Sequence, residues 1–140
     1  MVYVPVGNAG RKLEILLPAT GRWTAQRINP RNGAVEPLPA TEEEIRAVHT
    51  PKHVAEVRRE GVYDIAALAA GGAIRAAEIG RSEPCFAVIR PPGHHASADS
   101  AWGFCSFNNM AIALTALKRK NKIHNAFILD FDMHLSLIPI

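Results

Sequence analysis

Two groups of residues in this 140-residue chain have types and spacing that suit proton transfer and metal binding. The first is the adjacent pair His94 and His95, which follows a rigid Pro91-Pro92 step and the flexible Gly93. In a loop, neighbouring side chains can face one cavity. Two imidazoles in one pocket indicate proton transfer near neutral pH.

The second group is the pattern Asp130-x-Asp132-x-His134, which follows the apolar run Ala126 to Leu129. Side chains two residues apart share one face of a strand, so these three would lie together at the carboxyl end of a buried strand. Carboxylate oxygens and imidazole nitrogens suit zinc, and a catalytic zinc takes three protein ligands and keeps one position open. Asp132 and His134 are two candidates for that set.

The elements around these residues predict an α/β fold. A strand from about Cys85 to Arg90, the histidine loop, a helix from about Asn108 to Lys118 and a strand from Ala126 to Phe131 would form a βαβ unit. Such a crossover joins parallel strands, and sites in open parallel sheets form at the carboxyl ends of the strands. The sequence therefore predicts a partial open parallel sheet with flanking helices.

Three helices are expected upstream of this unit. Thr41 and Glu44 form a capping box that begins the first, which runs to about His49. Thr50-Pro51 begins the second, which Gly61 ends. The third is predicted from Ile65 to Ile79, with Asp64 as its cap and Gly80 at its end, and its internal Gly71-Gly72 pair predicts close packing against a sheet.

His49 and His53 are four residues apart, a spacing that invites a metal site. Pro51 lies between them and breaks the single helical face that such a site would use. We interpret both histidines as structural.

Three ordered blocks of sequence resemble a known family: RPPGHHA, GFCSFNNMAIA and ILDFDMH. In this order and with these intervals they are similar to the amino-terminal part of the zinc-dependent histone deacetylase superfamily, with its bacterial and archaeal amidohydrolase relatives. The resemblance extends from about Ala40 to His134. It implies a truncated arginase/deacetylase-like domain over residues 40–140, preceded by a divergent strand and loop segment over residues 1–39.

The resemblance also implies a role for each polar residue of the two groups. It makes Asp132 and His134 zinc ligands and Asp130 the partner of His94. His94 and His95 would handle the proton of the attacking water and that of the leaving amine.

Other implied features concern the substrate. Gly103 and Phe104 match residues that line a narrow channel for an acyl-lysine or acyl-amine chain, so the implied substrates are acetyl-lysine and acetylated amines. Oxygens around residues 130–134 would help to hold a structural potassium ion. Which acyl-amine is used depends on rim loops that the sequence does not reveal.

The chain departs from the family pattern after His134. The family continues there with a Gly-Asp-Gly segment whose aspartate orients the second tandem histidine, whereas this chain continues with Leu135 to Ile140. The third zinc ligand and the tyrosine that polarises the substrate carbonyl belong to later family segments. The site in this chain is therefore predicted to be incomplete.

Two other functions stay open on the sequence. A non-catalytic homologue would act through self-association or partner binding, with its apolar tail and open sheet edge as the contact surface. A manganese hydrolase of the arginase type would share the architecture, but its paired Asp-x-His-x-Asp pattern is not what stands here.

Composition sets the broad class of the protein. A hydrophobic fraction of 48% and a charged fraction of 21% are ordinary for a soluble globular protein. The net charge of +3 includes a basic cluster, Lys118 to Lys122, which we interpret as the solvated end of a helix. The sequence therefore indicates neither nucleic-acid nor membrane binding.

Cysteine usage and targeting signals complete this picture. The two cysteines, Cys85 and Cys105, define no disulfide framework, and we expect both to pack as small apolar side chains, with a thiol-based mechanism as a minor alternative. With no signal sequence or long apolar span, cytoplasmic residence is expected.

Overall fold

The computed structural model describes residues 26–28, 35–37, 39–130 and 132–133. Its described elements are a two-stranded antiparallel sheet and four helices. Strand β1 (Gln26–Ile28) pairs with β2 (Val35–Pro37), with Arg27 opposite Glu36. The helices are α1 (Glu42–Arg46), α2 (Pro51–Arg59), α3 (Tyr63–Gly80) and α4 (Asn109–Arg119).

The first two helices begin after the capping residues that the sequence predicts. Thr41 and Glu44 form both bonds of a capping box at α1. The Thr50 hydroxyl accepts from the His53 amide at α2, with Pro51 at the first helical position. Gly61, just beyond α2, has a φ of +74°, the left-handed conformation that ends a helix at low cost. These predictions are confirmed, although α1 ends at Arg46, before His49.

Helix α3 differs from the prediction at its start. It begins at Tyr63 after Val62, which makes no side-chain capping bond. The prediction that Asp64 is the cap is therefore wrong. Asp64 lies within the first turn, where its negative charge interacts favourably with the positive end of the helix dipole. Because the helix already begins after Val62, Asp64 lies two residues beyond the cap position.

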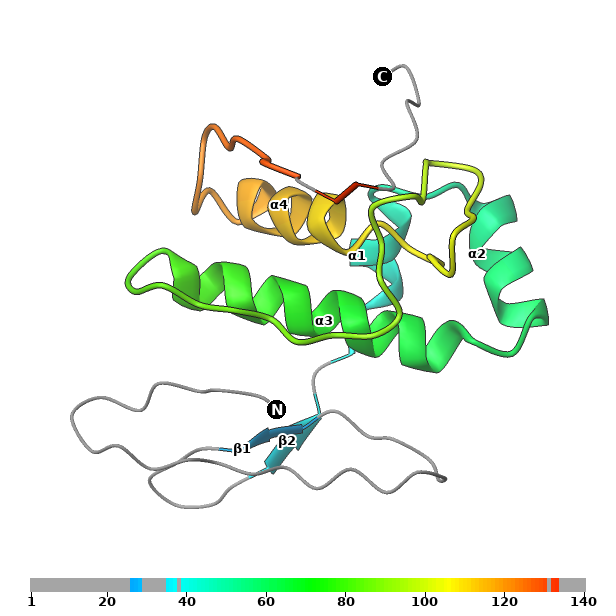
Figure 1. Cartoon of the computed structure of the whole chain (residues 1–140), viewed down its shortest axis with the longest axis horizontal. Helices are drawn as coiled ribbons and strands as arrows, with labels where there is room; N and C mark the ends of the chain where they lie inside the picture. Colours follow the sequence, from blue (N-terminus) through cyan, green and yellow to red (C-terminus); the bar gives the residue numbers. More distant parts are fainter. Residues whose placement is uncertain (1–25, 29–34, 38, 131, 134–140) are drawn as a thin grey trace.

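Helices α3 and α4 lie side by side and enclose the core (Figure 1). The largest fully buried side chains are Phe107, Ile45, Ile112 and Val57. The small residues of α3, among them Ala66, Ala70 and Gly71, let the two helices approach closely. Most of the core is therefore helix against helix.

The parallel sheet of the predicted fold class is not formed in the described part of the chain. Residues 85–90 and 126–130 run without strand pairing, and the β1–β2 ladder is the sheet that the described residues contain. Residues 81–90 instead turn back along α3 (Figure 1), where an ideal Cβ on Gly72 would meet Ile89 Cγ2 at 2.8 Å. The glycine pair thus serves close packing, as predicted, but against an unpaired segment.

The physical reason for this difference lies in how parallel strands are stabilised. Such a strand needs a hydrogen-bonded neighbour and cover on both faces. Within the described residues both segments have an outer face with no cover: Phe86 is 87% exposed and Phe127 is 88% exposed. An apolar run indicates that a segment can be buried, but the neighbouring strand and the covering layers must come from other segments.

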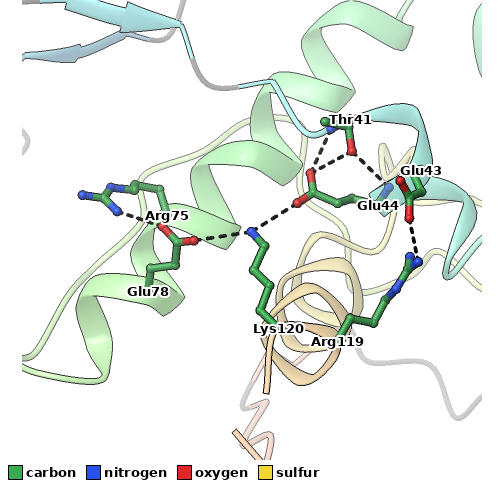
Figure 2. A network of polar contacts seen from close by, with 7 residues as sticks. All are labelled: Thr41, Glu43, Glu44, Arg75, Glu78, Arg119 and Lys120. Atoms are coloured by element: carbon green, nitrogen blue, oxygen red, sulfur yellow. Dashed lines mark hydrogen bonds and ion pairs between the residues drawn. The ribbon is translucent and has the colours of Figure 1, made fainter. Parts of the chain in front are cut away.

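The basic cluster at the end of α4 is engaged in ion pairs (Figure 2). Arg119 contacts Glu43 of α1 at 2.6 Å. Lys120 lies 3.5 Å from Glu44 and 3.6 Å from Glu78 of α3, which also pairs with Arg75. These contacts tie α4 to α1 and α3, so this part of the cluster serves as a helix terminus and not as a free basic patch.

Among the described helices, none has the length and apolar character needed to cross a membrane. Cytoplasmic residence stays a prediction. The proposed division at residue 40 is likewise untested by the structure.

Candidate functional site

The tandem histidines occupy the centre of a tight turn. The Ala96 amide donates to the Gly93 carbonyl at 3.1 Å, and His94 and His95 are the two residues between them. Their rings lie 4.1 Å apart, centroid to centroid. A turn with two central histidines brings both imidazoles to one place, as the sequence predicts for this loop.

Two adjacent asparagines at the start of α4 anchor this turn. The side-chain amide of Asn108 donates to the Ala96 carbonyl, and that of Asn109 donates to the Pro91 carbonyl, each at 3.0 Å. Asn108 also caps α4 by accepting from the Ala111 amide at 3.0 Å. The helix and the histidine turn are therefore fixed to each other. The sequence analysis did not predict these two anchoring bonds.

Gly93 shows how closely the turn packs on the backbone before α4. An ideal Cβ at this position would lie 2.5 Å from the Phe107 carbonyl oxygen and 2.6 Å from the Asn109 amide nitrogen. Backbone atoms cannot give way as a flexible side chain can. Glycine is required here for close approach.

His94 forms a hydrogen bond with Asp130. Its Nδ1 lies 3.0 Å from Asp130 Oδ2, and the other carboxylate oxygen accepts from the Asp132 amide at 3.0 Å. That amide bond, followed by the contact with His94, lowers the pKa of Asp130 below its ordinary value. An ionised carboxylate can only accept, so Nδ1 carries the proton, and in the neutral imidazole Nε2 is then the acceptor. The contact that the resemblance implies is present.

His95 is 6% exposed and is enclosed by the segment that follows it. Its amide donates to the Cys105 sulfur at 3.4 Å. Its ring stacks on Trp102, with centroids 4.0 Å apart and planes inclined by 26°. The sequence analysis assigned no role to Trp102.

Gly103 and Phe104, the two residues assigned to a channel, both adopt left-handed backbone conformations. Their φ angles are +59° and +62°, and the Cys105 amide donates to the Trp102 carbonyl across them at 3.0 Å. This is the hydrogen-bonding pattern of a turn with two positive φ angles. Phe104 is 92% exposed. A positive φ is unusual for so bulky a residue.

His49 and His53 contact the backbone that leads into α4. The Asn108 amide donates to His49 Nε2 at 2.9 Å, and His53 Nε2 lies 2.8 Å from the Ser106 carbonyl oxygen. Both rings are almost fully buried. Burial, and next the neighbouring His53, lower the pKa of His49 from 6.5 to about 4, so it is neutral. The structural interpretation of this pair is confirmed.

Of the proposed metal ligands, Asp132 is described and exposed, whereas His134 and Phe131 lie outside the described residues. Within the part of the chain that the structure describes, no three His, Cys, Asp or Glu side chains gather as a metal site would require. The chemistry of the set, a carboxylate and an imidazole beside an ionised Asp130, suits zinc as part of its coordination shell.

The structure weighs against the thiol-based alternative. Cys105 is buried, and this burial raises the pKa of its thiol, an effect that the His95 amide only partly opposes. Cys85 is exposed, so the prediction that it packs is wrong. The segment that carries it is unpaired, which leaves the side chain in solvent.

Comparison with known proteins identifies the relatives of this chain. Residues 11–136 match the histone deacetylase domain. The chain belongs to the histone deacetylase family. A probable deacetylase of Archaeoglobus fulgidus is 41% identical over 118 residues, which cover 71% of this chain and 33% of that protein. The human polyamine deacetylase HDAC10 is 31% identical over 86% of this chain and 22% of its own length.

A solved structure is similar as well. The crystal structure of the HDA15 HD domain matches 58% of this chain and 29% of that one, with a TM-score of 0.52 and 36% sequence identity. The chain therefore folds in part like a histone deacetylase domain. The chain spans about a third or less of the length of the relatives described here.

Proposed function

We propose that this chain carries the tandem-histidine part of a zinc-dependent deacetylase site, which hydrolyses the amide of acetyl-lysine or of an acetylated amine. The observation that carries the proposal is the His94–Asp130 hydrogen bond, formed across 36 residues beside the stacked His95 in a member of the histone deacetylase family. Relatives named as deacetylases, including a polyamine deacetylase, support this substrate class.

The family resemblance implies the roles of the two histidines, and the His94–Asp130 hydrogen bond supports them. With its Nδ1 proton held by Asp130, His94 can accept a proton at Nε2 from the attacking water. His95, whose ring lies 4.1 Å away, is placed to donate a proton to the departing nitrogen. The C–N bond breaks, the new C–O bond comes from water, and the products are acetate and the free amine.

Zinc, when bound, would act as a Lewis acid and make the bound water easier to deprotonate. Asp132 and His134 would hold it, and Asp130 would act through His94 and through the Asp132 amide. A structural potassium ion near these residues is part of the same proposal. Gly103 and the exposed Phe104 would form one wall of the acyl chain's channel.

The deciding measurement is zinc per chain, by elemental mass spectrometry on protein purified without chelator, together with release of acetate from acetyl-lysine peptide and acetylpolyamine. His134→Ala should remove the zinc, and Asp130→Asn should weaken its binding less. His124→Ala, which changes an exposed histidine, is the matched control. Zinc content unaffected by His134→Ala would refute the ligand assignment.

Exposed apolar side chains favour a second candidate function, self-association. Phe86, Phe127 and Leu129 are 87%, 88% and 72% exposed, which is unusual for large apolar side chains gathered on two segments. A non-catalytic role would then rest on these segments. Light scattering on the eluted protein distinguishes the two: a zinc-free oligomer without acetate release favours self-association.

A further inference from the structure

Residues 102–105 form a turn that touches His95 at several points. The turn is closed by the bond from the Cys105 amide to the Trp102 carbonyl, and both of its central residues have positive φ. Trp102 stacks on the imidazole, and the Cys105 sulfur accepts from the His95 amide. The first and last residues of the turn thus hold the ring and the backbone of one histidine.

Gly103 completes this enclosure. An ideal Cβ on Gly103 would lie 2.4 Å from His95 Cδ2, so the imidazole occupies the space that any side chain would need. The left-handed φ of Gly103 also suits glycine better than other residues. The turn is therefore shaped around the His95 ring.

The two tandem histidines are held by different means. A hydrogen bond to Asp130 orients His94, whereas the ring contacts of His95 are with Trp102 and His94. Stacking of aromatic rings stabilises a pair beyond what burial of their area contributes. At 44% exposure, Trp102 keeps part of its surface in solvent while its ring covers the imidazole.

We propose that Trp102 is a positioning residue: its indole stacks on the His95 imidazole and fixes the orientation of that ring within the tandem pair. The stacking itself is independent of metal binding. Its catalytic meaning rests on the proposed function, because an oriented imidazole matters only where it transfers a proton to the leaving nitrogen.

The first test is nuclear magnetic resonance of histidine labelled with ¹³C and ¹⁵N. A stacked indole shifts the His95 ring protons upfield, so Trp102→Ala should move them downfield, while Trp102→Phe should restore part of the shift. Phe104→Ala removes a neighbouring aromatic ring that is 92% exposed and should leave the His95 signals in place. Unmoved His95 signals in Trp102→Ala would overturn the proposal.

The second test is kinetic. Trp102→Ala should lower kcat for acetate release roughly three- to tenfold, with KM and zinc per chain unchanged, and Trp102→Phe should recover most of the loss. Loss of zinc or of the folded state together with activity in both variants would indicate a structural role only and would overturn the inference. If the wild type releases no acetate, the proposed function fails, while the ring shifts still decide whether Trp102 orients His95.

Discussion

The histidine turn and the apolar segments that flank it, residues 85–90 and 126–130, differ sharply in how they are held. The turn is bonded to α4 by Asn108 and Asn109 and packs on backbone atoms through Gly93. The flanking segments have no strand pairing within the described residues, and their large side chains face solvent. The histidine turn is therefore held mainly by its contacts with the start of α4, whereas the segments beside it would need neighbouring strands in order to pair.

The largest effect is expected from a substitution that forces the histidine turn away from α4. Gly93→Ala places a methyl group against the Phe107 carbonyl and the Asn109 amide, which cannot move independently of the chain. We expect a loss of roughly 3 kcal/mol or more in the free energy of unfolding. Urea unfolding measures it. Gly80→Ala, where nothing lies within 4 Å, is the matched control and should be neutral or slightly stabilising. Equal stability of the two variants would contradict the close packing.

Acid should weaken the turn's support through His49. The pKa of His49 falls from 6.5 to about 4 on folding, so the unfolded chain binds a proton more readily. Stability from this residue is complete above about pH 6.5 and is lost as the pH falls towards 4, by at most about 3 kcal/mol.

His49→Gln isolates this effect, because a glutamine oxygen can still accept from the Asn108 amide but does not titrate. Unfolding free energies measured between pH 7 and pH 4.5 should fall less steeply in this variant than in the wild type. The exposed His124 gives the control His124→Gln, which should keep the wild-type slope. A wild-type slope in His49→Gln would show that other groups cause the acid sensitivity.

Asn108 allows the cap of α4 to be separated from the anchor of the turn. Asn108→Ala removes both bonds and should cost about 2 kcal/mol, whereas Asn108→Ser keeps a capping oxygen and should cost about 1 kcal/mol. Thermal unfolding followed by circular dichroism compares the two. If serine is as damaging as alanine, the bond to the Ala96 carbonyl dominates.

The smallest effect is expected in the exposed segments. Phe127→Ser changes a side chain that is 88% exposed, so the free energy of unfolding should change by less than about 0.5 kcal/mol. Measurement at two protein concentrations sharpens the contrast. A cost above 1 kcal/mol that grows with concentration would mean that self-association buries this ring.

Sequence predicts best what is local. The caps at Thr41 and Thr50 could be predicted because a cap depends on residues within one turn of it. Whether residues 85–90 and 126–130 pair as strands could not be predicted, because an apolar run indicates burial without showing which segment covers it. The His94–Asp130 contact came from family resemblance, not from spacing. The stacking of Trp102 on His95 was missed, since seven positions in a loop give no periodicity from which a ring contact follows.

The His94–Asp130 bond joins residues 36 positions apart and closes a loop that contains the whole of α4. Closing a loop of this length has an entropic cost, which the packing of α4 on α3 helps to offset. A ligand that binds this pair would hold the loop shut and slow the opening of residues 94–130, so hydrogen exchange of the α4 amides would report occupancy of the site from a distance.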